Sequence, residues 1–362
     1  METLNLYVYD KSMRLISIID SYSSLIWTDR YDDCGDFEIA FPYSEEAEEY
    51  LEVLKKDCYC GIDYSLRKMI IEKIEYEYSE DGASTIIVSG RSLESILARR
   101  IILGKTEFGT DSSETNLQNG IKTILNQNVI SPSDPKRAIQ NFIFQESEDE
   151  KITSLTFSES YNGEDVYSII SELCKDKKIG FKITFNNNNE FVFELFAGDD
   201  HSYDQQTNPV IVFSPYYDNL KNSNFYTSTE EFKNVMLISV DESTTISASN
   251  ITPEPEGLER REILVDKNDL KTNQSSNLST KRLQVKAQKK LKNEYDVKTG
   301  FDAEIVPDVL YRYGEDYDIG DIVQLIDIFN NNEKLRISEV AITCDDNGFN
   351  IIPTFTELEE DE

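Results

Sequence analysis

SYSSLIWTDRYDDCGDFEIAFP, residues 21–42, is the stretch that decides how this chain folds. Leu25 and Trp27 fall on one face of its first half, because side chains on a strand alternate with a period of two. After the turn-forming letters DDCG, the same alternation continues in Phe37, Ile39 and Phe41. Two alternating runs joined by an Asp- and Gly-rich turn predict a β-hairpin with one buried face. The hairpin also carries the single Trp of the chain.

Composition predicts a folded protein of several domains. A chain of 362 residues has the length of roughly two to three domains. Charged residues make up 29%, but 20 Tyr and 18 Phe supply apolar surface that disordered chains lack. The balance of 69 acidic and 36 basic residues disfavours sequence-independent binding to nucleic-acid phosphates and to anionic membrane surfaces.

The start of the chain shows no secretory leader, and no apolar run reaches the ~18 residues of a membrane span. We therefore expect a soluble protein that is made in a cytoplasm and does not insert into a membrane. The cysteines are scattered and odd in number, and their spacing does not match a zinc knuckle. We expect unpaired, mostly buried thiols in a reducing compartment at Cys34, Cys58, Cys60, Cys174 and Cys344.

Residues with recognisable chemistry are missing from the sequence. The single histidine, His201, lies in a polar loop, GDDHS, and cannot build a multi-histidine metal site. Phosphate-cradling glycine loops and nucleophile motifs are also absent. We therefore predict no enzyme, no catalytic, cofactor-binding or metal-binding residues, and no cofactor. A two-carboxylate hydrolase stays an open alternative, because acidic residues are so numerous.

The pattern of the first hundred residues predicts mostly strands. The expected strands are residues 4–9, 15–20, 58–64, 69–78 and 84–89, the last two joined by a turn at Asp81–Gly82. Ser44 is expected to cap one helix, and Gly90 to open a second whose apolar stripe is Leu93, Ile96, Leu97 and Ile101. The arginines beside that second helix are either ion-paired or an anion site: Arg91, Arg99 and Arg100.

A Gly- and Ser-rich linker at residues 104–113 is expected to lead into a small α+β domain that ends near Tyr226. Two helices are expected there, with apolar faces made of Leu117, Ile121, Ile124 and Leu125, and of Val166, Ile169, Ile170, Leu173 and Cys174. Residues 180–185 and 191–196 predict a hairpin with the asparagines 186–189 at its tip.

Thr280 is expected to cap a basic helix, after strand-like residues 232–247 and a polar loop at 273–279. Its apolar face is Leu283, Ala287 and Leu291, and the remaining positions carry Lys281, Arg282, Lys286, Lys289, Lys290 and Lys292. Three interpretations stay open: a solvated helix, a patch for nucleic acid or a protein partner, and a surface that docks on an acidic neighbouring copy.

Two stretches of the chain repeat one pattern. KMIIEKIEYEYSEDG (68–82) and KLRISEVAITCDDNG (334–348) have the same length and end in an acidic turn closed by Gly. The matching apolar positions are Ile71 with Ile337, Ile74 with Val340 and Tyr76 with Ile342. Upstream, residues 57–63 and 321–327 share an Asp spacing that aligns Asp57 with Asp321. The sequence thus predicts one β-module built twice.

Five stretches, in order along the chain, also carry a resemblance to a known family. They are SSLIWTDRYDDCGDFEIAFP (23–42), SGRSLESILARRII (89–102), VIVFSPYYDNLKNSNFYTSTEEFKNVMLI (210–238), GLERREILVD (257–266) and YGEDYDIGDIVQL (313–325). Together they resemble the siphophage tail-hub family, tail-tip proteins that share the hub fold of contractile-tail baseplates. Residues 105–209 resemble it least.

The resemblance implies a β-rich α+β, multi-domain fold with two related β-barrel domains and α+β insertions. The implied domains are a first barrel at 1–105, an inserted α+β domain at 106–226, a second barrel made of 227–250 and 300–362, and a small insertion with the basic helix at 251–299. Three chains of this family close a ring of six barrels, which matches a threefold tip to a sixfold tube.

The implied function is a structural tail-tip hub in the phage virion, made in the bacterial cytoplasm. Its partners would be two further copies in a homotrimer, the tail tube or distal tail protein ring, and downstream fibre or tip proteins. DNA would pass through the lumen without specific binding. The alternatives are a receptor- or glycan-binding tail protein and a cell-wall hydrolase, although the chain shows no hydrolase domain after the acidic residues 357–362.

Overall fold

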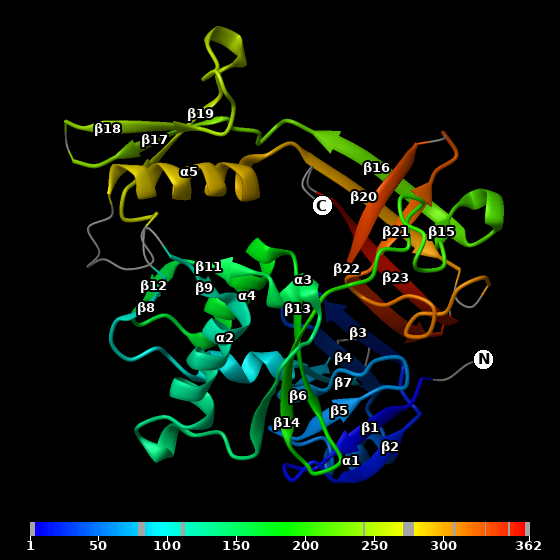
Figure 1. Ribbon diagram of the computed structural model, residues 1–362. Helices are drawn as coiled ribbons and strands as arrows, with labels where there is room; N and C mark the ends of the chain where they lie inside the picture. The colour runs from blue at the N-terminus through cyan, green and yellow to red at the C-terminus, as the bar shows by residue number, and fades with distance from the viewer. Residues whose placement is uncertain are drawn as a thin grey trace.

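The computed structural model describes residues 4–78, 84–109, 113–241, 243–270, 279–306, 309–329, 331–346 and 348–358. The protein is β-rich, as the sequence predicts, with several sheets and fewer helices (Figure 1). The expected turn at Asp81–Gly82 and most of the expected loop at 273–279 lie outside the described residues.

One large sheet contains 13 strands in the order β16-β20-β23-β22-β3-β4-β7-β6-β5-β1-β2, with β21 beside β22 and β15 beside β21. Its first module is β1 (Leu6–Tyr9), β2 (Leu15–Ile19), β3 (Ser24–Arg30), β4 (Asp36–Pro42), β5 (Tyr59–Gly61), β6 (Met69–Tyr78) and β7 (Ser84–Ser92). Its second module is β15 (Val212–Phe213), β16 (Leu220–Ser228), β20 (Lys298–Ile305), β21 (Ile322–Ile326), β22 (Asn332–Asp345) and β23 (Gly348–Glu357).

The predicted hairpin of residues 21–42 is confirmed as β3 and β4, which pair antiparallel. Trp27 lies opposite Phe37, with ring centroids 5.9 Å apart, and both side chains are buried. The other edge of β3 pairs with β22 along residues 24–30, so this strand joins the two modules. The helix after Ser44, α1 (Glu45–Leu51), is also confirmed, and Ser44 accepts a hydrogen bond from the N–H of Ala47.

The inserted domain, elements β8 to β14, packs its own core against the first module. The predicted helices are confirmed as α2 (Leu117–Leu125) and α4 (Val166–Lys177), and the predicted hairpin as β13 (Gly180–Phe185) with β14 (Phe191–Phe196). The smaller elements are β8 (Thr106–Phe108), β9 (Thr115–Asn116), η2 (Asn126–Ile130), η3 (Pro135–Arg137), β10 (Phe142–Gln145), α3 (Glu150–Thr153), β11 (Thr156–Phe157) and β12 (Glu159–Tyr161).

An arm, made of β17, β18, β19 and α5, projects from the end of the long β16–β20 pair (Figure 1). Its apolar side chains form a third core around Met236, Ala287 and Leu291. The elements are β17 (Val235–Ser239), β18 (Thr245–Ser249), η5 (Gly257–Glu259), β19 (Glu262–Asp266) and α5 (Thr280–Tyr295). The cap of α5 is Ser279, whose side chain accepts a hydrogen bond from the N–H of Arg282, and not Thr280 as expected. Residues 227–250 were expected in the second barrel, but β17 pairs with β18 on one side and with β19 on the other, in a sheet of their own.

Two further expectations differ locally from the structure. Gly90 and Arg91 are strand residues at the end of β7, and the helix after them is the 3₁₀ helix η1 (Leu93–Arg99). The β6 backbone passes so close that a Cβ on Gly90 would lie 1.8 Å from the carbonyl oxygen of Ile70. Ile101 is 47% exposed and outside the apolar stripe. The expected linker at 104–113 contains β8, which pairs with β12.

The large sheet does not close on itself within the described residues, because its pairing path ends at β16 and at β2. The two β-barrels implied by the resemblance stay a prediction. Strands β15 and β16, which the expected division placed in the inserted domain, hydrogen-bond to the large sheet, and η4 (Pro215–Tyr217) lies between them. Cores of the first and second modules merge into one apolar cluster around Trp27, Ile337 and Phe355.

Candidate functional site

The repeated sequence pattern lies on matching strands of the two modules. In the first module, β6 pairs with β7 and has an irregularity in register between Ile71 and Lys73. In the second, β22 pairs with β23 and has the same irregularity between Ile337 and Glu339. These are equivalent positions in the sequence repeat. A β-bulge at the same place in both copies indicates that the repeat is structural.

The backbone hydrogen bonds beside the two bulges also match. In the first module, the N–H of Ile71 donates to the carbonyl oxygen of Cys58, and the carbonyl oxygen of Ile71 accepts from the N–H of Asp57. In the second module, the N–H of Ile337 donates to the carbonyl oxygen of Asp321, and the carbonyl oxygen of Ile337 accepts from the N–H of Gly320. Asp57 and Gly320 both have positive φ, 65° and 94°. Asp57 is therefore equivalent to Gly320, and its sequence alignment with Asp321 is one residue out of register. The sequence alignment matched one Asp with another, but the backbone hydrogen bonds define which residues of the two modules are equivalent.

Strand order is the same in both modules. The first module runs β3-β4-β7-β6-β5-β1 and the second runs β16-β20-β23-β22-β21-β15. The one difference in these paths is at the end, because β1 is antiparallel to β5 whereas β15 is parallel to β21. The prediction that one β-module is built twice therefore agrees with the strand order, the bulges and the hydrogen bonds.

Besides the outer edges of β2 and β15, two strand edges of the large sheet lack a strand partner within the described residues, and we call these two the open edges. On β22, one edge pairs first with β21 and then, along Glu339–Asp345, with β3. The equivalent edge of β6 pairs with β5 at Met69 and Ile70, and no strand of the described residues pairs with its outer part, residues 73–78. The second open edge is β16, for which the described part of the chain supplies β20 as a partner on the other side only.

Side-chain exposure follows this difference. Tyr76 and Tyr78 on β6 are 66% and 77% exposed, whereas the equivalent Ile342 and Cys344 on β22 are 0% and 5% exposed. On β16, residues 223–227 are all exposed, on both faces of the strand. Exposed strand edges with large apolar side chains are where sheets add further strands. The open edges are therefore the candidate functional site of this chain.

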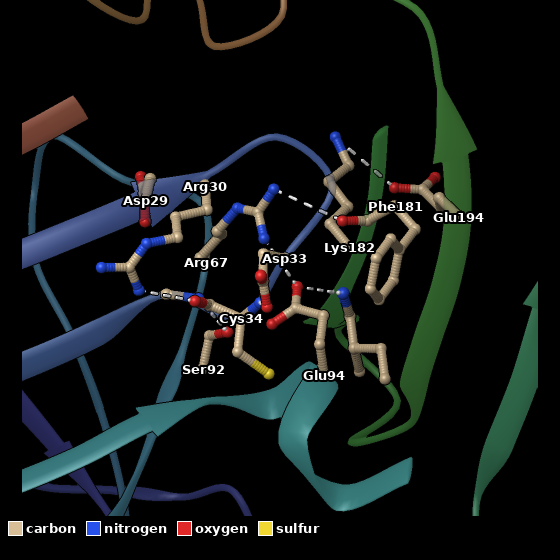
Figure 2. A network of polar contacts seen from close by, with 12 residues as sticks. Asp29, Arg30, Asp33, Cys34, Arg67, Ser92, Glu94, Phe181, Lys182 and Glu194 are labelled. Carbon is tan, nitrogen blue, oxygen red and sulfur yellow. Dashed lines mark hydrogen bonds and ion pairs between the residues drawn. The ribbon is translucent and has the colours of Figure 1, made fainter. Parts of the chain in front are cut away.

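A buried ionic network fastens the first module to the inserted domain (Figure 2). The guanidinium of Arg67 donates to Glu94 Oε1 (3.0 Å) and to the carbonyl oxygen of Phe181 (3.3 Å). The N–H of Ile183 donates to the same Glu94 oxygen (2.9 Å). Side chains of Arg67 and Glu94 are 4% and 0% exposed. The pair thus joins η1, the loop after β5 and strand β13.

Asp29 is a second buried carboxylate near Arg67. It accepts hydrogen bonds from Trp27 Nε1 (3.1 Å), Ser65 Oγ (2.7 Å) and the Tyr313 hydroxyl (3.4 Å). Burial raises the pKa of Asp29 above its ordinary value, although the positive charge of Arg67 and the hydrogen bonds lower it in part. Tyr313 belongs to the second module, so Asp29 links the two modules.

Replacing Asp29 with Asn is expected to change how stability depends on pH. A raised pKa means that the folded chain binds this proton more tightly than the unfolded chain, so Asp29 destabilises the fold as pH rises through the folded pKa. Relative to Asp29→Asn, the wild type should lose unfolding free energy from about pH 4, near the unfolded pKa, towards neutral pH. Urea titrations of both proteins across this range test this. A difference that stays constant with pH would contradict it.

The turn of the β3–β4 hairpin docks on helix α4. Asp33 accepts hydrogen bonds from the Tyr167 hydroxyl and from Lys175 Nζ (2.9 Å), and Ser171 donates to the carbonyl oxygen of Asp32 (2.8 Å). Burial alone would raise the pKa of Asp33, but these hydrogen bonds outweigh burial and lower the pKa. The hairpin thus positions the inserted domain as well as the second module.

Tyr31, the first residue after β3, connects the first module with the second module and with the inserted domain. Its N–H donates to the carbonyl oxygen of Ser338 (3.0 Å), and its hydroxyl donates to that of Lys178 (3.2 Å). Gly320 lies against the ring, where a Cβ would come within 2.2 Å of Tyr31. Positive φ and this close contact together require glycine at position 320.

A family model for Siphovirus ReqiPepy6 Gp37-like protein matches residues 5–355 of the chain. The chain belongs to this family. None of the curated protein sequences matches this Gp37-like protein.

Three solved structures similar to this Gp37-like protein are tail proteins. The 43 kDa tail protein of prophage MuSo2 from Shewanella oneidensis has a TM-score of 0.62 and 14% identity, with 98% of each chain covered. A tail protein from Neisseria meningitidis MC58 has a TM-score of 0.60 and 12% identity, with 98% of this chain and 97% of that chain covered. The prophage tail protein gp18 from Listeria monocytogenes EGD-e has a TM-score of 0.50 and 12% identity, with 98% and 95% covered.

These similarities establish a phage tail-protein fold over nearly the whole Gp37-like chain. The resemblance to phage tail proteins drawn from the sequence is confirmed.

Residues with candidate chemistry in the sequence lie apart in the structure. No disulfide links the five cysteines, all of which lie in the described residues, and all five are buried, as predicted. His201 lies in a loop, as predicted, but its side chain is buried, with Nδ1 2.8 Å from the carbonyl oxygen of Pro209. Within the described residues, no cluster of three His, Cys, Asp or Glu side chains could hold a metal, and no helix is long and apolar enough to cross a membrane.

The basic residues mostly pair with carboxylates of the same chain. Lys286 and Lys289 of α5 contact Glu159 (3.1 Å) and Asp176 (2.6 Å) in the inserted domain. Arg91 pairs with Glu72 and Arg99 with Asp57, as the ion-pair alternative predicts, and Arg100 donates to the carbonyl oxygen of Arg137 (2.6 Å). Part of the basic helix thus docks on an acidic surface of its own chain.

Sequence reasoning missed the open edges and the network of Arg67, Glu94 and Asp29. A signal for one edge was present, because Tyr76 stands where the second copy of the repeat has Ile342. The network left no comparable signal, since its members are far apart in the sequence and surrounded by many other charged residues.

Proposed function

We propose that this protein is the hub of a siphophage tail tip, with three copies forming a ring of six similar modules. The observation that carries the proposal is the duplicated module, with its shared strand order and bulges and two open edges per chain. Three chains with two equivalent modules each can present six similar units to a sixfold partner. Each module would be a barrel-like unit, with β15 and β16 counted in the second module.

In this proposal the ring joins the tail tube, or a distal tail protein ring, to fibre or tip proteins, and DNA passes through the lumen. The net charge of −33 per chain supports passage of DNA without binding to the lumen. Proteins bind DNA without sequence preference when their Lys and Arg side chains neutralise its phosphates. The protein would act as a structural part of the virion and not as an enzyme. A glycan array and a cell-wall zymogram test the receptor-binding and hydrolase alternatives.

Native mass spectrometry and electron micrographs of tail particles test the proposal. The expected result is a species with three times the mass of the 41.6 kDa chain and a ring at the tail tip. A chain that stays monomeric, together with particles that have no such ring, would overturn it. A lumen lined by neutral or basic side chains in a reconstruction would overturn the part that concerns DNA.

Salt is expected to favour the ring. Each copy carries a net charge of −33, so copies repel one another at low ionic strength. Raising NaCl from about 50 mM to about 500 mM shortens the screening length from roughly 14 Å to roughly 4 Å. The trimer fraction in analytical ultracentrifugation should therefore rise with salt. Dissociation with added salt would show instead that ion pairs between copies hold the ring.

A further inference from the structure

We infer that the two open edges are partners, so that β6 of one copy pairs antiparallel with β16 of the next and Tyr76 lies opposite Phe225. This inference rests on the proposed ring and specifies the contact that closes it. The partner is a second copy of this chain, joined by strand addition.

The junction inside the chain serves as the template. There the outer part of β22 pairs antiparallel with β3, and Ile342 lies opposite Trp27. Both side chains are fully buried. This junction connects the second module to the first within one copy. A ring of alternating modules also needs a junction from the first module of one copy to the second module of the next.

Equivalent strands carry the missing junction. The matching bulges make β6 equivalent to β22, so that Tyr76 of the first module is equivalent to Ile342 of the second. Cross-strand partners show that β16 is equivalent to β3. In the first module, Ile71 pairs with Gly90, Gly90 with Phe37, and Phe37 with Trp27. In the second module, Ile337 pairs with Phe355, Phe355 with Phe301, and Phe301 with Phe225. Phe225 therefore takes the position of Trp27.

The side chains that this register brings together are compatible. The expected pairs are Ile74 with Thr227, Glu75 with Tyr226, Tyr76 with Phe225, Glu77 with Asn224 and Tyr78 with Ser223. Aromatic residues meet at the centre, and no two like charges lie opposite each other. Aromatic cross-strand pairs stabilise a sheet, whereas like charges directly opposite destabilise it.

Each copy offers one edge of each kind. The contact is therefore heterologous, joining different surfaces of neighbouring copies, and such contacts form rings when the rotation closes. β16 also lacks the usual protection of an edge strand, since residues 223–227, SNFYT, contain neither a charge nor Pro. The uncharged sequence of residues 223–227 is explained if this edge of β16 is exposed in the single chain but covered by the neighbouring copy in the ring.

Disulfide trapping tests the register. Tyr76→Cys with Phe225→Cys places two thiols directly opposite each other, within the Cα separation that a disulfide tolerates. The matched control, Tyr78→Cys with Phe225→Cys, moves one thiol by two residues on the same face, beyond that separation. The five native cysteines are buried and remain in place. Circular dichroism of each variant checks that it folds.

The expected result is covalent trimer on a non-reducing gel, at least about tenfold more for the matched pair than for the control. A trimer in native mass spectrometry without trapping of the matched pair, or with stronger trapping of the control, would overturn the register but leave the proposed hub intact. Absence of any trimer or ring, by mass spectrometry and in particles, would overturn the proposed function and this contact with it.

Discussion

Replacing Arg67 with Met is expected to lower the free energy of unfolding by about 3–5 kcal/mol. Glu94, whose side chain is fully buried, would lose the guanidinium that donates to its Oε1. The other oxygen, Oε2, has no hydrogen-bond partner within the described residues, so the carboxylate depends heavily on Arg67. Truncation would also remove the donor to the carbonyl oxygen of Phe181. Urea unfolding followed by circular dichroism measures the loss.

The double variant Arg67→Met with Glu94→Gln is the control. It leaves no uncompensated buried charge at this pair, and replacing both partners of a buried ion pair often costs little. We therefore expect it to be more stable than Arg67→Met alone. Equal losses in the single and double variants would show that shape, and not charge, explains the effect.

The second large effect is a contrast between Trp27 and Phe225, which occupy equivalent positions in the two modules. Trp27→Ala should cost about 3–5 kcal/mol, because the ring is fully buried where β3 joins β4 and β22. Phe225→Ala should cost no more than about 1 kcal/mol in the single chain, because Phe225 is 37% exposed on an edge strand.

Assembly should show the opposite order. Phe225→Ala removes an aromatic residue from the contact proposed between copies, so the trimer should be lost or weakened in native mass spectrometry. Ser228→Ala, at the end of β16 and outside the proposed central pairs, is the matched control and should leave the trimer unchanged. A Phe225→Ala variant that forms as much trimer as the wild type would contradict the contact.

Local patterns explain why part of the fold could be predicted from the sequence. The hairpin around Trp27 alternates buried and exposed positions between turn signals, the pair β13–β14 flanks a turn-rich run of asparagines, and α2 and α4 carry apolar stripes at helical spacing. These signals depend on residues close in the chain. The same applies to the cap at Ser44, whose side chain bonds three residues ahead.

Other features depended on contacts between distant residues. Gly90 would suit the start of a helix, but the β6 backbone beside it holds it in a strand. Strands β17 and β18 read as strands in the sequence, but β17 pairs with β18 and β19, and the side chains of this sheet pack on α5, so both strands belong to the arm. Lys286 and Lys289 of α5 form ion pairs with Glu159 and Asp176, which lie more than a hundred residues earlier in the same chain.

By itself, the sequence determined that the chain is β-rich, that it builds one strand pattern twice, and that the stretch around Trp27 is a buried hairpin. Periodicity and turn residues encode these features locally. The tertiary structure alone decided the one-residue register of the repeat, the burial of Arg67 with Glu94, and which strand edges stay open. The physical reason is that hydrogen-bond ladders and buried charges are set by residues that meet only after the chain has folded.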